Sequence, residues 1–342
     1  MEPIKNCIIF GGTGFIGTHL TQYLLRNGLT DKIYLADLKP PRTQAYAKEL
    51  QDGLASGKVV YLHCDVRQPI PIGDLPDHGD LIFNLAAIHR EPGHAEHEYY
   101  ETNLPGATNV CDYATRIGCN RIVFTSSISP YGPSEDPKTE QSEPAPETPY
   151  GITKLAAEKI HREWQQGDQA RRLLIMRPGV VFGPGEGGNV TRLIRSLYRR
   201  YFLYMGNRET RKAGGYVKEL CHVIEYALDY QTNTGEGVVI VNFTMDPPTK
   251  LERFVEAICT SGGFERRPLS VPRWALLGVS YPIDSVARAL KITQPISPVR
   301  IRKLFRSTNI EPGWLRARGY QYKYTLEEAL SDWKRDYPEE FA

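Results

Sequence analysis

Residues 6–20 read Asn-Cys-Ile-Ile-Phe-Gly-Gly-Thr-Gly-Phe-Ile-Gly-Thr-His-Leu, and this stretch decides the fold. An apolar run of strand length ends at a glycine cluster that includes Gly11, Gly14 and Gly17. Apolar residues then recur with helical spacing at Ile16, Leu20, Leu24 and Leu25. The stretch therefore predicts a strand, a glycine-rich loop and a helix.

Each glycine of such a loop has a different structural role when a phosphate binds. One permits a tight turn, one lets a pyrophosphate approach bare backbone, and one lets the helix pack closely on the strand. The helix N-terminus then offers unpaired N–H groups and the positive end of its dipole to the phosphates. A structural turn without a ligand is the alternative explanation of such glycines, so the phosphate-loop interpretation needs support from residues further along.

Composition sets the broad class of the protein. A chain of 342 residues can bury a large core and favours roughly two domains. Its 42 basic and 40 acidic residues leave a net charge of +2, so no global field favours nucleic acid or an anionic membrane. Six cysteines without paired CxxC spacing indicate reduced core thiols, and the N-terminal residues show no signal peptide, so we expect a cytoplasmic protein.

Membrane insertion is not expected. The longest apolar candidate, residues 274–283, is about half the ~20 residues that a membrane-spanning helix needs. A peripheral membrane contact by this segment is not favoured either.

A second predicted strand, residues 32–37, ends in Asp37, which lies 20 residues after Gly17. At this spacing a dinucleotide-binding fold places a carboxylate that accepts hydrogen bonds from the adenosine ribose hydroxyls. Such a carboxylate repels a 2′-phosphate and favours NAD over NADP. Lys39 and Arg42 stand close enough in sequence to hold an extra phosphate, so NADP stays open.

Two further strands are expected at residues 59–64 and 80–87. After the first, Asp65 can reach the adenine amino group while Val66 packs on the ring. The second ends in the small residues Ala86 and Ala87, which leave space for a cofactor. Because helix and strand patterns alternate, the fold class is α/β, with a doubly wound parallel sheet.

The loop after the fourth strand, residues 88–97, holds three histidines and two acids. Their spacing does not match a helical HExxH pair, and Pro92-Gly93 indicates a loop, so no metal site is expected. Because the loop follows the carboxyl end of a sheet strand, we expect His89 and Arg90 to face a substrate.

Tyr150 and Lys154 stand four residues apart at the start of a predicted helix, so their side chains share one face. A free tyrosine titrates near pH ~10, and a nearby ammonium lowers that pKa by stabilising the phenolate. Tyr150 can then take the proton of a substrate hydroxyl as hydride leaves the same carbon. Ser127, at the end of a strand predicted over 121–127, would hydrogen-bond that oxygen, and Lys154 would also bind the nicotinamide ribose.

Together these motifs resemble the extended short-chain dehydrogenase/reductase family, within it the nucleotide-sugar epimerases and dehydratases. The resemblance is carried by Gly11-x-x-Gly14-x-x-Gly17, Asp37, Asp65-Val66, Asn84-Leu85-Ala86-Ala87, Asn103, Thr125-Ser126-Ser127, Tyr131-Gly132, Tyr150-x-x-x-Lys154 and Arg177-Pro178-x-x-x-Phe182-Gly183-Pro184. It implies a Rossmann domain for NAD over residues 1–182, with a return segment at about 216–245. A smaller C-terminal α/β domain, residues 183–215 and 246–342, would bind a nucleoside-diphosphate sugar. A homodimer through the helices that carry Asn103 and Tyr150 is also implied.

The resemblance assigns roles to individual residues. Ser127, Tyr150 and Lys154 would be catalytic. Contacts to NAD are expected from Gly11, Thr13, Gly14, Phe15, Ile16, Gly17, Asp37, Asp65, Val66, Leu85, Ala86, Ala87, Asn103, Thr125, Ser126, Tyr150, Lys154, Pro178 and Val180. Contacts to substrate are expected from His89, Arg90, Ser127, Asn189, Arg211 and Arg300.

The enzyme subclass within this family is narrowed by residues that this chain lacks. Dehydratases of this family carry an acidic pair after the position of Ser127, where this chain has Ile128 and Ser129. Neither residue can act as the acid or base of water elimination, which leaves a 4-epimerase or a 4-keto reductase/dehydrogenase. Val180 stands where many relatives have asparagine, a departure that resembles the 3β-hydroxysteroid dehydrogenases. A non-catalytic NAD-sensing regulator is disfavoured because Tyr150 and Lys154 are both present.

Residues in the second half of the chain favour a substrate that contains phosphate. Asn189 opens a helix pattern resembling the family segment whose asparagine contacts the nucleotide, and Arg211 and Arg300 offer the forked donors that a pyrophosphate needs. Residues 216–219 are expected to form the return strand, and residues 133–149 a surface loop. The aromatic stretch 314–324 lacks a basic groove, so nucleic acid is not an expected partner.

Overall fold

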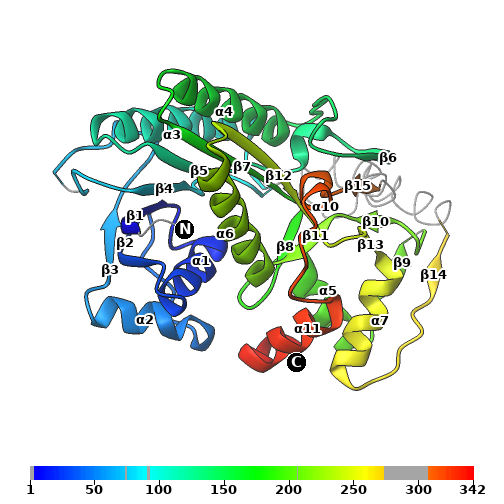
Figure 1. The fold of residues 1–342 in the computed structure, drawn as a ribbon. Helices are drawn as coiled ribbons and strands as arrows, with labels where there is room; N and C mark the ends of the chain where they lie inside the picture. Colours follow the sequence, from blue (N-terminus) through cyan, green and yellow to red (C-terminus); the bar gives the residue numbers. More distant parts are fainter. Residues whose placement is uncertain (1–3, 74, 91–92, 206, 273–306) are drawn as a thin grey trace, which may run out of the picture.

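The structure, a computed structural model, describes residues 4–73, 75–90, 93–205, 207–272 and 307–342 (Figure 1). Its centre is a seven-stranded sheet in which every neighbouring pair is parallel. In spatial order the strands are β12 (Val238–Phe243), β7 (Arg172–Pro178), β5 (Arg121–Thr125), β4 (Leu81–Asn84), β1 (Ile4–Phe10), β2 (Thr30–Asp37) and β3 (Val59–His63). The order reverses next to β1, which confirms the predicted doubly wound Rossmann sheet.

Helices cover both faces of this sheet (Figure 1). Cys7 and Ile9 of β1 belong to a core shared with α1 (Phe15–Arg26), α2 (Lys48–Ala55) and α6 (Val217–Thr234). Ile8 and Phe10 of the same strand point the other way, into a core shared with α3 (Glu96–Arg116) and α4 (Pro149–Gln166). Because successive side chains of a strand alternate, one apolar run supplies both cores, as in a buried parallel strand.

The prediction of a return strand at residues 216–219 is wrong. Strand β11 (Gly214–Tyr216) pairs with β8 (Val180–Phe182), and α6 begins at Val217. Buried Val217, Leu220 and Ile224 follow helical rather than strand spacing, which explains the difference. The chain returns to the main sheet with β12, beside β7.

The expected surface loop at residues 133–149 contains a strand, so that prediction was incomplete. Strand β6 (Ser134–Lys138) forms the edge of a four-stranded sheet with β15 (Thr308–Ile310), β10 (Arg211–Lys212) and β13 (Thr249–Lys250). Pro137 masked the strand in the sequence, but an edge strand tolerates a residue that lacks an N–H donor.

A third core surrounds Phe182, Phe254 and Trp333, with side chains from α5 (Asn189–Tyr198), β9 (Tyr204–Met205), α7 (Leu251–Gly262), α11 (Leu326–Asp336) and the 3₁₀ turn Pro338–Phe341. The other elements are β14 (Ser270–Val271), α10 (Gly313–Ala317), whose Leu315 belongs to the first core, and the 3₁₀ turns Ala45–Ala47 and Ser129–Tyr131. The predicted domain boundaries stay a prediction.

All six cysteines are buried and free. Within the described ranges, no helix has the length and apolar character needed to cross a membrane. Two sequence predictions, the apolar segment 274–283 and Arg300, lie outside the described residues.

Candidate active site

The glycine loop joins β1 to α1 at the carboxyl edge of the sheet. Gly11 has a φ of +72°, and a Cβ there would lie 2.7 Å from the backbone nitrogen of Ala86. A Cβ on Gly17 would lie 2.4 Å from the carbonyl oxygen of Gly12. Helix α1 starts after Gly14 without a side-chain cap, so its first N–H groups remain available. The loop therefore fits a dinucleotide pyrophosphate, as the sequence predicts.

Asp37 ends β2 beside this loop. Its carboxylate accepts hydrogen bonds from the backbone N–H groups of Thr13 at 3.1 Å and Leu38 at 2.7 Å. Arg42 reaches the same place, where it donates to the hydroxyl of Tyr46 at 3.0 Å and to the carbonyl of Thr13 at 3.4 Å. The carboxylate that the sequence predicts to favour NAD and the Arg42 cation, which could hold the extra phosphate of NADP, thus both contact the backbone of Thr13.

Asp65 follows β3 and forms a bidentate pair with Arg67, whose Nη2 lies 2.6 Å from Oδ2. Hydrogen bonds from Arg67 lower the pKa of this carboxyl, although burial opposes the shift. Val66 is buried and packs against Gly106 of α3. An adenine amino group would share the Asp65 carboxylate with Arg67.

Leu85, Ala86 and Ala87 continue the chain beyond β4 and are half-buried, with Leu85 N donating to Phe10 O at 2.9 Å. Asn103 of α3 hydrogen-bonds both the backbone N–H and the carbonyl of Ile88, the residue after Ala87. Its Nδ2 donates to Ile88 O at 3.2 Å, and its Oδ1 accepts from Ile88 N at 2.9 Å. Asn103 therefore fixes the path of the strand-end loop, a positioning role that its place in a motif did not reveal.

The strand β5 ends at Thr125, beside α4. Lys154 is 2% exposed, and its ammonium donates to the carbonyl of Thr125 at 2.6 Å and lies 4.3 Å from the centre of the Phe124 ring. Burial lowers the pKa of Lys154 to about 7, and the nearby Glu158 carboxylate opposes this shift. The buried Thr125 hydroxyl has no partner among the described residues. A polar ligand such as a ribose would satisfy it, so the residues present fit the cofactor.

Ser127 follows β5, and Tyr150 lies in the first turn of α4. The Ser127 hydroxyl lies 3.0 Å from Ser129 Oγ and accepts from Ser129 N at 3.1 Å. A Cβ on Gly151 would come within 2.7 Å of Ser129 O, so the first turn of α4 packs tightly on this segment. Tyr150 is half-buried in that turn, one turn before Lys154. The three predicted catalytic residues thus gather where β5 ends and α4 begins.

A buried ion pair behind this group was not predicted. Glu158, one turn after Lys154 on α4, accepts from Arg177 Nη2 and from Ser126 Oγ, each at 2.5 Å. Arg177 also donates to the hydroxyl of Tyr131 at 2.6 Å. The signal available in the sequence was the spacing of Glu158, which continues the Tyr150–Lys154 face by one more turn.

The predicted substrate contacts are spread over several elements. His89 and Arg90 are exposed in the loop after β4, with the Arg90 carbonyl accepting from the Tyr99 hydroxyl at 2.5 Å. Asn189 is the first residue of α5, and its Oδ1 accepts from Arg192 at 2.7 Å. Arg211, in β10, donates to Pro248 O at 3.1 Å. Pro178 ends β7, and Val180, 39% exposed, opens β8.

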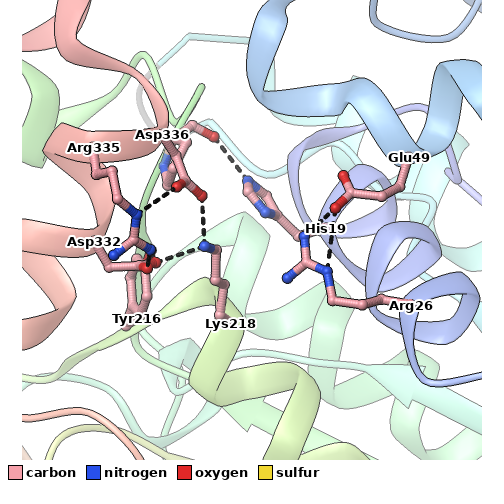
Figure 2. A network of polar contacts seen from close by, with 9 residues as sticks. His19, Arg26, Glu49, Tyr216, Lys218, Asp332, Arg335 and Asp336 are labelled. Atoms are coloured by element: carbon pink, nitrogen blue, oxygen red, sulfur yellow. Dashed lines mark hydrogen bonds and ion pairs between the residues drawn. The ribbon is translucent and has the colours of Figure 1, made fainter.

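A second polar cluster, shown in Figure 2, joins α1, α6 and α11. The Lys218 ammonium lies 2.6 Å from a carboxylate oxygen of Asp332 and 2.6 Å from one of Asp336. His19 lies 2.8 Å from Pro184 O, and burial lowers its pKa to about 4. A cavity of about 150 Å³ lies among these residues. The two ion pairs of Lys218 therefore tie α11 to α6.

Among the described residues, no group of three or more His, Cys, Asp or Glu side chains is placed to hold a metal ion. The predicted loop 88–97 runs two residues into α3, which begins at Glu96, and both His94 and His97 are exposed. His94 faces Glu98 of α3, at an Nδ1–Oε2 distance of 3.4 Å.

The model of the NAD dependent epimerase/dehydratase family matches residues 7–241. An N-acetyl-alpha-D-glucosaminyl-diphospho-ditrans,octacis-undecaprenol 4-epimerase of Escherichia coli O157:H7 is 27% identical over 327 residues, covering 95% of this chain and 93% of that protein.

Two further proteins are similar over nearly the whole chain. A 3beta-hydroxysteroid-dehydrogenase/decarboxylase isoform 2 of Arabidopsis thaliana is 25% identical over 96% of this chain and 61% of its own length. The crystal structure of a UDP-glucuronic acid 4-epimerase from Bacillus cereus, in complex with NAD, superposes with a TM-score of 0.72 at 18% identity. The match covers 98% of this chain and 100% of that one. At this identity the structural match shows the shared fold.

Proposed function

The chain belongs to the NAD dependent epimerase/dehydratase family, and we propose that it is an NAD-dependent 4-epimerase of a sugar carried on a diphosphate. The nucleoside-diphosphate sugars favoured by the sequence are the first substrate class. The E. coli relative, whose name gives a polyprenol diphosphate as the carrier, adds a second class with the same linkage. The observation that carries the proposal is the buried ammonium of Lys154. Lys154 lies on α4 one turn after Tyr150, and its ammonium donates to Thr125 O at 2.6 Å.

The glycine loop, Asp37, Asp65 and Thr125 would hold the cofactor. When bound, NAD supplies a reversible hydride acceptor for C4 of the sugar. Tyr150 takes the proton of the C4 hydroxyl and later returns it, since the Lys154 ammonium stabilises the phenolate. Ser127 donates a hydrogen bond to the same oxygen and fixes its distance from Tyr150.

The proposal includes a homodimer through α3 and α4 and a cytoplasmic location. The two helices lie side by side on one face of the sheet (Figure 1), and Ile152 of α4 is 40% exposed there. Six buried free thiols suit a reducing compartment. Sedimentation velocity at micromolar concentration tests the dimer, and a monomer would contradict it.

The decisive experiment incubates the purified protein and NAD with UDP-N-acetylglucosamine or with polyprenyl-diphospho-N-acetylglucosamine. We expect the C4 epimer to form from at least one substrate without net NADH, and Tyr150→Phe to slow this conversion by about 10²–10⁴-fold. Accumulation or consumption of NADH would instead indicate a 4-keto reductase/dehydrogenase. If neither substrate is converted or stabilises the protein against heat, the proposal fails.

A 3β-hydroxysteroid dehydrogenase-like activity is the second candidate. It is favoured by the Arabidopsis relative and by Val180 at the start of β8. Such an enzyme would produce NADH stoichiometrically from a 3β-hydroxysteroid and NAD. A steroid that stabilises the protein when no diphospho-sugar does so would favour this candidate.

A further inference from the structure

The small parallel ribbon of β9 and β14 exposes an apolar face. Tyr204 pairs with Ser270 and Met205 with Val271, and Tyr204 N donates to Leu269 O at 2.9 Å. Side chains alternate along a strand, so the buried Tyr204 faces the protein while Leu203 and Met205 face away from it. In this register Leu203 and Leu269 are neighbours on the outer face.

Exposed apolar side chains are concentrated here. Eight large hydrophobic residues are exposed in the described part of the chain, and four of them form this surface. We call these four the ribbon patch: Tyr201 (63% exposed), Leu203 (42%), Met205 (49%) and Leu269 (73%). Single exposed apolar residues need no explanation, but a contiguous group indicates an interaction surface.

Arginines surround the ribbon patch. Arg199, Arg200, Arg208 and Arg267 are all exposed. Residues 192–212 contain six arginines, one lysine and one glutamate, in a chain whose net charge is only +2. The acidic neighbours are Glu209, Glu265 and, on α7, Glu252 and Glu256, and Glu252 N donates to Arg208 O at 3.1 Å. Two of these carboxylates face other cations, Glu209 with Lys250 and Glu256 with Arg253, each at 3.6 Å. The local charge is therefore positive although the whole chain is nearly neutral.

One of these arginines is fixed on the ribbon itself. Arg208 Nε donates to Ser270 Oγ at 2.7 Å, and the guanidinium lies 5.0 Å from the centre of the Tyr204 ring. Since the side chain stays exposed, its remaining donors face outward. Tyr204 and Ser270 share the side of the ribbon opposite Leu203 and Met205, so this cation lies at the edge of the ribbon beside the apolar face.

We propose that the ribbon patch and its arginines dock the protein on the surface of an anionic lipid bilayer. Exposed aliphatic and aromatic side chains enter the boundary between headgroups and acyl chains, while arginines bind the lipid phosphates. A second copy related by a two-fold axis would place one ring of arginines against the other, which like charges oppose. The inference goes beyond the proposed function and concerns a peripheral contact, in which no segment crosses the membrane.

The position of this surface suits a substrate held at a membrane. Helix α5 starts at Asn189, which the sequence predicts to contact the substrate, and its C-terminal cap is Arg199. A helix of this length spans about 15 Å at ~1.5 Å per residue. The ribbon patch thus lies one short helix away from the expected diphosphate end of the substrate.

Arg200 is the arginine whose charge can be removed with the least disturbance of the backbone. It follows the C-terminal cap of α5 with a φ of +64°, and it is the single non-glycine residue with a positive φ in the described chain. Glycine adopts this conformation with less strain, so Arg200→Gly should keep or improve the fold. A purely structural role for Arg200 would therefore leave membrane binding unchanged in this variant.

The test is co-sedimentation of the full chain with vesicles of equal parts phosphatidylglycerol and phosphatidylcholine, compared with pure phosphatidylcholine. We expect binding to the anionic vesicles that weakens in high salt. Met205→Glu with Leu269→Glu should weaken binding at least tenfold, and Arg200→Gly severalfold. Ile72→Glu, which changes an exposed apolar residue elsewhere, is the matched control and should bind like the parent.

Three results would overturn the proposal. They are no binding of the parent chain to anionic vesicles, equal binding of the patch variants, and loss of a self-association in sedimentation velocity when the patch is changed. The last would identify a second copy as the occupant. Thermal unfolding and NAD binding check that each variant folds. Because vesicle binding is measured without substrate, its failure is distinguishable from failure of the proposed epimerase activity.

Discussion

Arg177 and Glu158 form an ion pair that is almost fully buried, with side chains 4% and 2% exposed and Nη2 and Oε2 2.5 Å apart. Glu158 lies on α4 and Arg177 on β7, and Ser126 at the end of β5 donates to the same carboxylate. The Glu158 side chain therefore connects α4, which carries Tyr150 and Lys154, to the segment after β5 that leads to Ser127. We infer that Glu158 is a positioning residue for the proposed catalytic group.

Glu158→Gln should destabilise the protein by about 3–5 kcal/mol, because it leaves the buried Arg177 charge without its counterion. Urea denaturation measures this change. The control Glu163→Gln, at an exposed position of the same helix, should stay within about 0.5 kcal/mol of the parent. Equal stability of the two variants would show that the pair contributes little.

Glu158→Gln should also shift the pH dependence of kcat. The Glu158 carboxylate raises the pKa of Lys154, so its removal should let Lys154 lose its proton at a lower pH. The high-pH limb of kcat, which requires the ammonium, should then shift to lower pH in Glu158→Gln. A merely structural role would lower kcat at every pH and leave the limb in place.

Tyr150→Phe should reduce kcat by about 10²–10⁴-fold, because the ring stays while the proton-transferring hydroxyl is lost. NAD affinity and thermal stability should stay near those of the parent, as measured by calorimetry and thermal unfolding. Tyr34→Phe, in β2, serves as the matched control and should keep full activity. An active Tyr150→Phe protein would contradict the proposed role and support a different base.

Lys154→Met should change how stability depends on pH. Folding lowers the Lys154 pKa from its ordinary 10.5 to about 7, so between these values the unfolded chain holds a proton that the folded chain does not. The parent should therefore gain stability with rising pH, by up to about 1.4 kcal/mol per unit from this group. Below pH 7 both states are protonated and this slope vanishes.

Urea denaturation at pH 7, 8 and 9 measures the effect. Lys154→Met lacks the titrating group, so the stability of the parent relative to the variant should rise across this range. Lys159→Met, exposed on the same helix, should run parallel to the parent. Parallel curves for Lys154→Met as well would mean that Lys154 keeps an ordinary pKa.

Asp37→Ser should shift cofactor preference towards NADP. The carboxylate that repels a 2′-phosphate is removed, while Arg42 remains beside Thr13 to bind it. We expect the ratio of NAD to NADP affinity to fall by at least about tenfold, ~1.4 kcal/mol, in calorimetric titrations. Arg42→Ala added to Asp37→Ser should cancel the gain, and an unchanged ratio would place the discriminating residue elsewhere.

Much of the fold was readable because its signals are local. Strand, glycine loop and helix follow one another within residues 4–26, and turn geometry needs only the residues of the turn. The strand at 134–138 and the helix start at Val217 were misread, since an edge position and tertiary contacts overrode local composition. The contacts of Asn103 with Ile88 were equally hidden, because they join residues 15 positions apart.

The sequence by itself determined the Rossmann architecture, the acid at Asp37 and the helical spacing of Tyr150 and Lys154, because short-range periodicity and turn chemistry specify each of them. Only the tertiary structure decided what surrounds these residues. The buried carboxylate of Glu158, the burial that lowers the Lys154 pKa and the joining of Leu203 to Leu269 in one exposed patch all depend on segments far apart in the chain. Burial and pairing across such separations are properties of the packed fold, and no local pattern encodes them.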